Sequence, residues 1–493
     1  MSLQFVFGPS GGGKSYYLYE KIIEEAKKDR TKDFLLIVPE QFTMQTQKEL
    51  VERSKNHAIM NIDVLSFERL AFRVFDELGM YQIRILEETG KNLILRRLTE
   101  EYGDSMSVLG SNLKKMGYVS EIKSLISEFM QYQITPEDIE AWCEDEDNAW
   151  SFRLKMKDIL VIYRKFLEYL EGSYITSEEV LEECAKTAGR SVMLKDCNLI
   201  FDGFTGFTPV QVNLLKTLFP MTDRVWAAVT LDKRVDPFCV TGIQELFHMS
   251  QKMVRTLLEL ADEAKCEVLE PIWVEDGRQY RYGNAKALLH LEENLFRSSL
   301  KAYPKEQDEI QIQSCQNRKE ELEFAAATIS RMVREEDYRY RDFAIVSGAA
   351  ADYANYVKEI FEAYGIPYFI DEKKTILFHP FIEFLRASLE MVEEDFSYES
   401  VMRYFRSGLS RQSTEEIDRL ENYILATGIW GYRKWNHVFE KCPAGYCEET
   451  LEELNQIRSN FMECAGVFRE VLAKKKTTVK EKTCLLYTYP SPR

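Results

Sequence analysis

A glycine-rich segment of eight residues close to the start of this chain limits the folds open to it more than any other segment. The segment Gly8-Pro9-Ser10-Gly11-Gly12-Gly13-Lys14-Ser15 matches the pattern G-x-x-x-x-G-K-[ST] without a gap. It follows an apolar stretch, residues 3–7, that predicts a buried strand, and it precedes residues 15–26, whose apolar positions have helical spacing. Strand, glycine loop and helix are the context that the pattern needs, so we expect ATP to bind at Gly8–Ser15.

Each residue type in this loop has a role in that chemistry. Glycines let the backbone wrap a polyphosphate, and the amides at the helix start point towards it. Lys14 would reach the terminal phosphates, and Ser15 would ligate a Mg2+ ion. The alternative is an ordinary glycine turn between a strand and a helix, which the complete pattern and its flanks disfavour.

Further strands and helices alternate along the chain. Buried strands are predicted at residues 34–38, 62–65, 197–202 and 224–229. Ser66 stands at the N-cap position of the helix that follows the third strand. From residue 86 to 190 the pattern is almost purely helical, so a helical insertion interrupts one parallel, doubly wound sheet.

A second β/α region is predicted to begin near residue 309. Its expected strands are residues 309–314, 342–346 and 365–370, its expected helices are residues 319–334 and 353–364, and residues 381–472 are helical again. We therefore expect a first core formed by residues 1–85 and 191–300, a helical insertion at 86–190, the start of a second core at 301–380, a second helical insertion at 381–480, and a tail at 481–493.

Composition excludes some classes of protein and leaves others open. The chain has 493 residues and a net charge of −17, which does not suggest a stand-alone nucleic-acid binder but permits a local basic groove. No apolar run approaches the roughly 20 residues of a membrane span, and a strand begins by residue 3, so we expect a cytoplasmic protein without a signal peptide. The ten cysteines and five histidines are dispersed, so we expect no metal cluster from them.

The order of these segments resembles the UvrD-type superfamily-1 DNA helicases, and in particular the AddB (RexB) family of subunits of the bacterial AddAB helicase–nuclease. The P-loop is the most specific part of the resemblance. Residues 38–43 take the place of helicase motif Ia, residues 63–71 resemble the segment that follows it, and residues 342–346, 365–371 and 379–380 resemble the region around motif IV. The resemblance covers residues 1–480 and implies RecA-like P-loop cores, each with a large all-helical insertion, the second core being incomplete.

The sequence departs from an active helicase of this type where the ATPase chemistry is concentrated. Such helicases end the Walker B strand with Asp-Glu, in which the aspartate holds magnesium and the glutamate activates water. Here the strand ends Asp202-Gly203, so Asp202 could contact Mg2+ but no carboxylate follows it to act as a general base. We expect a chain that binds nucleotide and hydrolyses it poorly. The alternative role for Asp202 is a strand-end carboxylate that caps the next turn.

The resemblance further implies a function in DNA repair. AddB-type subunits pair with the active helicase–nuclease AddA, process double-strand DNA ends for recombinational repair and read the regulatory sequence Chi in the emerging single strand. Their nuclease domain, with a four-cysteine iron–sulfur cluster, lies beyond residue 493, so neither is expected here. Residues 484–493 change character abruptly and resemble a non-native extension, with a disordered natural tail as the alternative.

Related helicases bind single-stranded DNA on the loops after the second and third strands. In this sequence those loops hold Gln41, Phe42, Thr43, Ser66 and Phe67. Either phenylalanine could stack on a base, a contact that contributes about 1–3 kcal/mol. The alternative is that both phenylalanines belong to the core beside the sheet.

Two other classes of function remain open. A P-loop small-molecule kinase would need a lid with arginines and a substrate pocket within roughly 200 residues, and the helical insertion and second β/α region argue against it. An interaction scaffold with a vestigial P-loop would not need the intact Lys14 and Ser15. Nucleotide affinity would distinguish the scaffold, and a response to DNA would distinguish the kinase.

Overall fold

The chain forms two compact units, residues 1–312 and 313–493, which we describe separately. A computed structural model describes residues 1–82, 84–110, 116–171, 174–274, 281–297, 301–371, 376–410, 412–443, 445–473 and 478–488. Among these residues, no helix combines the length and the apolar composition that crossing a bilayer requires.

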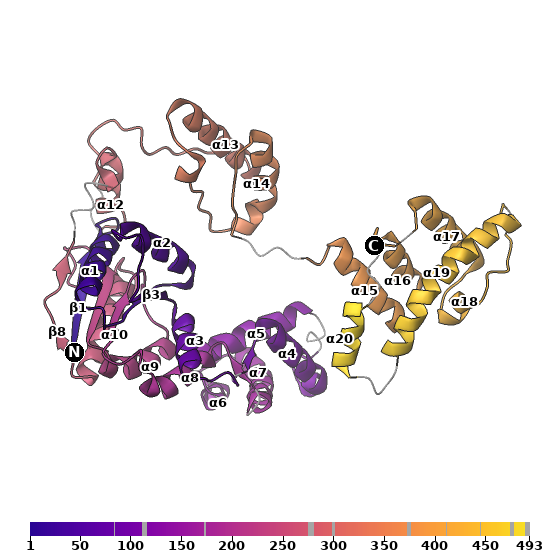
Figure 1. The fold of residues 1–493 in the computed structure, drawn as a ribbon, viewed down its shortest axis with the longest axis horizontal. Coiled ribbons are helices and arrows are strands. Elements are labelled where there is room, and N and C mark those ends of the chain that lie inside the picture. The colour runs from indigo at the N-terminus through magenta and orange to yellow at the C-terminus, as the bar shows by residue number, and fades with distance from the viewer. Residues whose placement is uncertain are drawn as a thin grey trace. The chain divides into compact units, whose positions relative to one another are not determined.

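A parallel sheet forms the centre of the first unit (Figure 1). Its strands are β1 (Ser2–Gly8), β2 (Phe34–Ile37), β3 (Ile62–Leu65), β6 (Asn198–Phe201), β7 (Arg224–Thr230), β8 (Glu267–Val268) and β9 (Ile272–Trp273). Their order is β3-β2-β6-β7-β1-β8, with β9 also paired to β1, and every one of these pairings is parallel. The predicted α/β class is confirmed, and the five longer strands lie where the sequence predicted them. The two-residue strands β8 and β9 were not predicted, because so short a segment has no measurable periodicity.

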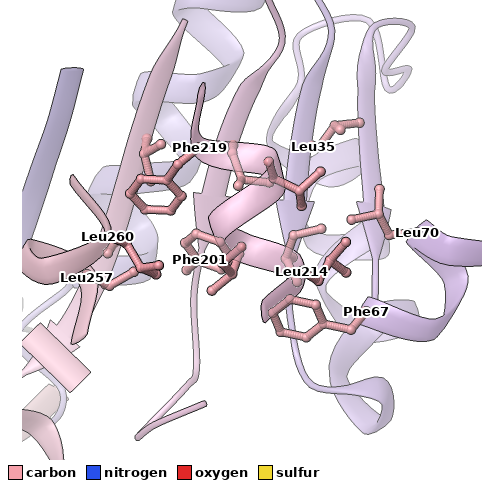
Figure 2. Close-up of a cluster of buried hydrophobic side chains, with 14 of the residues drawn as sticks. Leu35, Phe67, Leu70, Phe201, Leu214, Phe219, Leu257 and Leu260 are labelled. Carbon is pink, nitrogen blue, oxygen red and sulfur yellow. The ribbon is translucent and has the colours of Figure 1, made fainter. Parts of the chain in front are cut away.

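Helices cover both faces of this sheet, which is why its strands are apolar on both sides. On one face lie α1 (Lys14–Lys28) and α2 (Thr43–Arg53), and on the other lie α3 (Phe67–Glu77), α8 (Glu179–Thr187), α9 (Pro209–Leu218) and α10 (His248–Glu263). Successive strand residues alternate between the two layers, so that Leu36 faces α1 and α2 while Leu35 faces the other four helices. Figure 2 shows the larger layer, in which Phe201 of β6 lies among Phe67 of α3 and Leu214 of α9.

A helical insertion lies between α3 and α8. Its helices are α4 (Glu88–Tyr102), α5 (Met116–Gln131), α6 (Pro136–Glu144) and α7 (Trp150–Leu170), and a two-stranded parallel sheet of β4 (Ile85–Leu86) and β5 (Ile175–Thr176) connects its two ends. These helices enclose a core of their own, which includes Leu95, Ile126, Ile162 and Phe166. The predicted helical character of residues 86–190 is thus confirmed. The first unit also contains α12 (Lys286–Asn294), after β9.

The described residues of the second unit form helices and loops but no strand. Helices α13 (Arg318–Glu335) and α14 (Ala350–Tyr364) pack on each other through a small apolar cluster. A larger aromatic core, which includes Phe405, Trp435 and Phe461, is enclosed by α15 (Pro380–Glu393), α16 (Tyr398–Arg406), α17 (Thr414–Thr427), α18 (Tyr432–Asn436) and α19 (Glu448–Leu472). The helical prediction for residues 381–472 is confirmed.

The prediction of strands at residues 309–314, 342–346 and 365–370 is wrong. None of these segments is a strand, although the helices between them form as expected. A strand needs a neighbour for its backbone hydrogen bonds, and no described segment pairs with any of these three. Their apolar side chains consequently face solvent, with Ile312 96%, Val346 94% and Phe369 89% exposed.

The end of the chain also differs from expectation in part. Residues Val479–Thr488 form a helix, α20, whereas the sequence favoured a tail without an ordered element from residue 481. Helix α20 contacts α19, and such packing stabilises a short helix that would be marginal alone. Residues 489–493 lie outside the described residues.

Candidate nucleotide-binding site

The P-loop joins the carboxyl end of β1 to the amino end of α1. Gly11 and Gly13 have φ angles of 72° and 92°, a backbone region that side chains other than glycine rarely adopt. Gly13 is the N-cap of α1, and no acidic residue stands in the first turn of that helix. The helix therefore presents backbone amides and the positive end of its dipole to the loop, an arrangement that favours an anion.

Lys14 is held inside the loop by the backbone. Its Nζ atom donates a hydrogen bond to the carbonyl oxygen of Pro9 at 2.9 Å. The pKa of the Lys14 ammonium is lowered to about 8, mainly by burial; the charges of Asp202 and Glu292 oppose this shift, and the Arg281 guanidinium adds to it. A polyphosphate would supply a strong counter-charge, so the ammonium is poised to bind an anion.

Ser15 and Asp202 meet on the other side of the loop. The Ser15 hydroxyl donates to Oδ1 of Asp202 at 3.1 Å, although 187 residues separate them in the sequence. Parallel strands bring their carboxyl ends to one edge of a sheet, and Asp202 follows β6 at the edge where the P-loop follows β1. A hydroxyl and a carboxylate are oxygen ligands of the kind that Mg2+ prefers, so the residues present fit that ion.

Tyr19 completes this cluster and was not identified from the sequence. Its hydroxyl donates to Oδ2 of Asp202 at 2.8 Å and lies 3.5 Å from Oγ1 of Thr46. Burial first, and then the Asp202 charge, raise the pKa of Tyr19 well above its ordinary range, so this phenol remains a donor. Tyr19 lies four residues after Ser15 on α1, and that spacing, which places both on one helix face, was the available signal.

The backbone conformation at Gly203, the residue after Asp202, is one that favours glycine. Gly203 has a φ angle of 80°, and a Cβ there would lie 3.4 Å from Cδ of Pro39, an ordinary contact. Space would therefore admit a side chain, but the left-handed backbone would strain it by about 1–2 kcal/mol. The backbone at position 203 therefore favours glycine over a residue with a carboxylate side chain.

The five residues predicted to contact DNA divide into two groups. Gln41 and Phe42 are exposed, Phe42 by 43% of its surface. Thr43 is buried and donates to the carbonyl of Glu40, and Ser66 is the buried N-cap of α3, accepting from the amide of Arg69. Phe67 is 5% exposed and packs against Phe201, Phe204 and Phe207.

A cavity of about 320 Å3 lies beside these loops. Apolar side chains and three glutamates, Glu40, Glu68 and Glu178, line it, together with Ser66 and Phe67. Partial desolvation raises the pKa of the Glu68 carboxyl, and the charges of Glu40 and Glu178 raise it further. Glu40 pairs with Arg69 at 3.2 Å and Glu178 pairs with Lys91 at 2.7 Å, so two of the three carboxylates have a cation beside them.

Other kinds of site find less support in the described parts of the chain. No group of three or more histidine, cysteine, aspartate or glutamate side chains there could hold a metal ion. The ten cysteines are all free thiols. The P-loop residues with Asp202 and Tyr19 are therefore the candidate site.

Comparison with known proteins shows the family of this chain. The model of the family described as "ADDB, N-terminal" matches residues 5–292, more than half of the chain. The chain is 41% identical over 493 residues to the ATP-dependent helicase/deoxyribonuclease B subunit of Lachnoclostridium phytofermentans, covering 99% of this chain and 43% of that protein. The proteins of the same name from Clostridium tetani and Clostridium novyi are 34% and 33% identical, over 88% and 99% of this chain and 38% and 42% of theirs. The chain thus spans less than half the length of these relatives.

Proposed function

Because this chain belongs to the ADDB N-terminal family, we propose that it is the ATP-binding, helicase-like part of the AddB subunit of a helicase–deoxyribonuclease. The complete enzyme would process double-strand DNA breaks for recombinational repair, in the cytoplasm and in a heterodimer with AddA. The relatives from Lachnoclostridium phytofermentans and Clostridium tetani carry the name of that helicase and deoxyribonuclease activity, which supports the proposal. Within the complex, this part would bind ATP and Mg2+ and contact single-stranded DNA that contains Chi.

The fold assembles Lys14, Ser15 and Asp202 around the amino end of α1, from segments far apart in the sequence. Lys14 would leave the Pro9 carbonyl and bind the terminal phosphates, and Ser15 and Asp202 would hold Mg2+. The ion would neutralise phosphate charge when bound.

The same site supports slow turnover. Asp202 is followed by Gly203, whose backbone favours glycine, so no carboxylate stands at that position to orient water. Hydrolysis by the complex would then be the task of AddA. We propose that nucleotide binding in this chain regulates or stabilises the assembly.

Contact with single-stranded DNA is proposed for the loops after β2 and β3. Gln41 and Phe42 are accessible for it, whereas Thr43, Ser66 and Phe67 would act by holding those loops in place. We also propose that residues 1–85 with 191–300 form the first core, that residues 301–380 begin a second one, and that residues 86–190 and 381–480 are their helical insertions. The exposed apolar side chains of Ile312, Val346 and Phe369 support an incomplete second core.

Calorimetric titration with Mg–ATP tests the proposal directly. We expect micromolar binding by the wild-type chain, loss of binding in Lys14→Ala, and negligible ATP turnover with or without single-stranded DNA. Brisk DNA-stimulated turnover would make the chain a working motor. If the well-folded chain binds no nucleotide, the result would support a scaffold function. If it phosphorylates a small molecule and does not respond to DNA, the result would support a kinase.

A further inference from the structure

The segment that follows β9 packs directly on the glycines of the P-loop. The amide of Val274 donates to the carbonyl of Phe7 at 2.8 Å, which places Val274 beside the end of β1. A Cβ on Gly12 would lie 2.8 Å from the carbonyl oxygen of Val274, and a Cβ on Gly8 would clash with the same oxygen. Two of the loop glycines are therefore needed for this packing, independently of any phosphate.

The chain approaches the same loop again at Arg281 and Tyr282. A Cβ on Gly11 would lie 2.5 Å from Cδ of Arg281 and 3.4 Å from Cε2 of Tyr282. A hydrogen bond from the amide of Ala285 to the carbonyl of Tyr282, at 3.0 Å, connects this turn to α12. The arginine stem thus lies against the middle of the phosphate-binding loop.

The guanidinium of Arg281 adds a second positive charge at this loop. The side chain is exposed, and within the described residues its guanidinium makes neither an ion pair nor a hydrogen bond. Because the stem of Arg281 lies against Gly11, three residues before Lys14, both cations stand at the same loop. A polyanion bound there would be attracted by both charges.

We propose that Arg281 is a second phosphate-binding cation of this site, supplied by the segment that follows β9. This inference rests on the proposed binding of a nucleotide at the P-loop. A guanidinium offers several fixed donors that match phosphate oxygens, whereas the Lys14 ammonium acts as a compact charge. The two side chains would therefore favour nucleoside di- and triphosphates over monophosphates.

Equilibrium titration of the full chain with ATP, ADP and AMP, each with Mg2+, tests the role of Arg281. We expect Arg281→Ala to weaken ATP and ADP binding roughly tenfold, the effect of one charge-assisted hydrogen bond, and to change AMP binding by less than about twofold. Arg281→Lys should recover part of the loss, because it keeps the charge without the planar donors. Arg255→Ala is the matched control, since it removes an arginine of 67% side-chain exposure on α10 that pairs locally with Glu259.

The outcomes separate this inference from the proposed function. Wild-type binding that is lost in Lys14→Ala but unchanged in Arg281→Ala would overturn the role of Arg281 and leave nucleotide binding intact. Tighter binding in Arg281→Ala would also overturn it, because the arginine would then obstruct the loop. A folded wild-type chain that binds none of the three nucleotides would overturn both. Because Arg281 is exposed, its variants should unfold at the wild-type temperature, which thermal unfolding would verify.

Discussion

Tyr19 donates a hydrogen bond of 2.8 Å to Asp202, and this contact joins the first turns of α1 to the end of β6 across 183 residues of sequence. Ser15 donates to the other oxygen of the same carboxylate. Asp202 is only 7% exposed, so both donors help to offset the loss of water around its charge. The strand-end aspartate is thus stabilised by two side chains of α1.

Replacing Tyr19 by phenylalanine should destabilise the first unit by about 1–3 kcal/mol, because a buried carboxylate oxygen loses its donor while the ring is retained. Urea unfolding would measure the change. Tyr17→Phe is the control, since Tyr17 is on the same helix and its hydroxyl makes no hydrogen bond within the described residues. Equal stability of the two variants would contradict the role of Tyr19.

Nucleotide affinity should depend on pH through Lys14. The pKa of Lys14 in the free site is about 8, below its ordinary value of 10.5, and bound phosphate would raise it again. Binding then takes up a proton above pH 8, so affinity should be level below pH 8 and fall about tenfold per pH unit above it. Calorimetry between pH 7 and 9.5 would measure this slope. The Lys14→Ala variant should bind weakly, and its affinity should not change with pH in this range.

Placing a glutamate after Asp202 should not create an efficient ATPase. At a φ of 80°, a side chain leaves the backbone in a different direction from one on an extended strand, and Gly203→Glu would have to adopt that strained geometry. We expect turnover near the wild-type level and a melting temperature lower by about 3 °C. Gly203→Ala is the control, because it has the same backbone strain but no carboxylate. Brisk turnover in Gly203→Glu but not in Gly203→Ala would show that the wild-type chain lacks only the general base.

Lys91 should be essential for the stability of the helical insertion. It is 2% exposed, and its ammonium binds Glu178 at 2.7 Å, Glu88 at 3.0 Å and the hydroxyl of Ser177 at 3.1 Å. Lys91→Met would leave Glu178 without its principal counter-charge and should cost about 3–5 kcal/mol. Lys165→Met, at a lysine that pairs with Glu168 on its own helix, should change the unfolding midpoint little. Similar midpoints for both variants would refute this assignment.

The two phenylalanines near the proposed DNA-binding loops should behave differently. Phe42 is 43% exposed and Phe67 is 5% exposed, so only the first is available to stack on a base. Phe42→Ala should weaken binding of labelled single-stranded DNA about tenfold without changing stability, whereas Phe67→Ala should destabilise the fold by about 3–5 kcal/mol. Fluorescence anisotropy and thermal unfolding would measure the two effects. Unchanged DNA affinity in Phe42→Ala would exclude stacking at this loop.

Much of the first unit could be predicted from the sequence because its signals are local. The P-loop pattern, the apolar strands and the N-cap at Ser66 each depend on residues within one turn or strand of one another. The helical insertion was recognisable for the same reason. By contrast, the strands predicted after residue 309 had the right local pattern but no partner among the described residues, and pairing is what makes a strand.

Lys14 and Ser15 belong to one short motif, so residue type and spacing were enough to predict a nucleotide site there. The distant residues that join this motif depend on tertiary contacts. Tyr19 reaches Asp202 because β6 enters the sheet between β2 and β7, and Arg281 reaches Gly11 because β9 pairs with β1. Sheet order is set by the burial of both faces over the whole unit, a property that no local segment of the sequence contains.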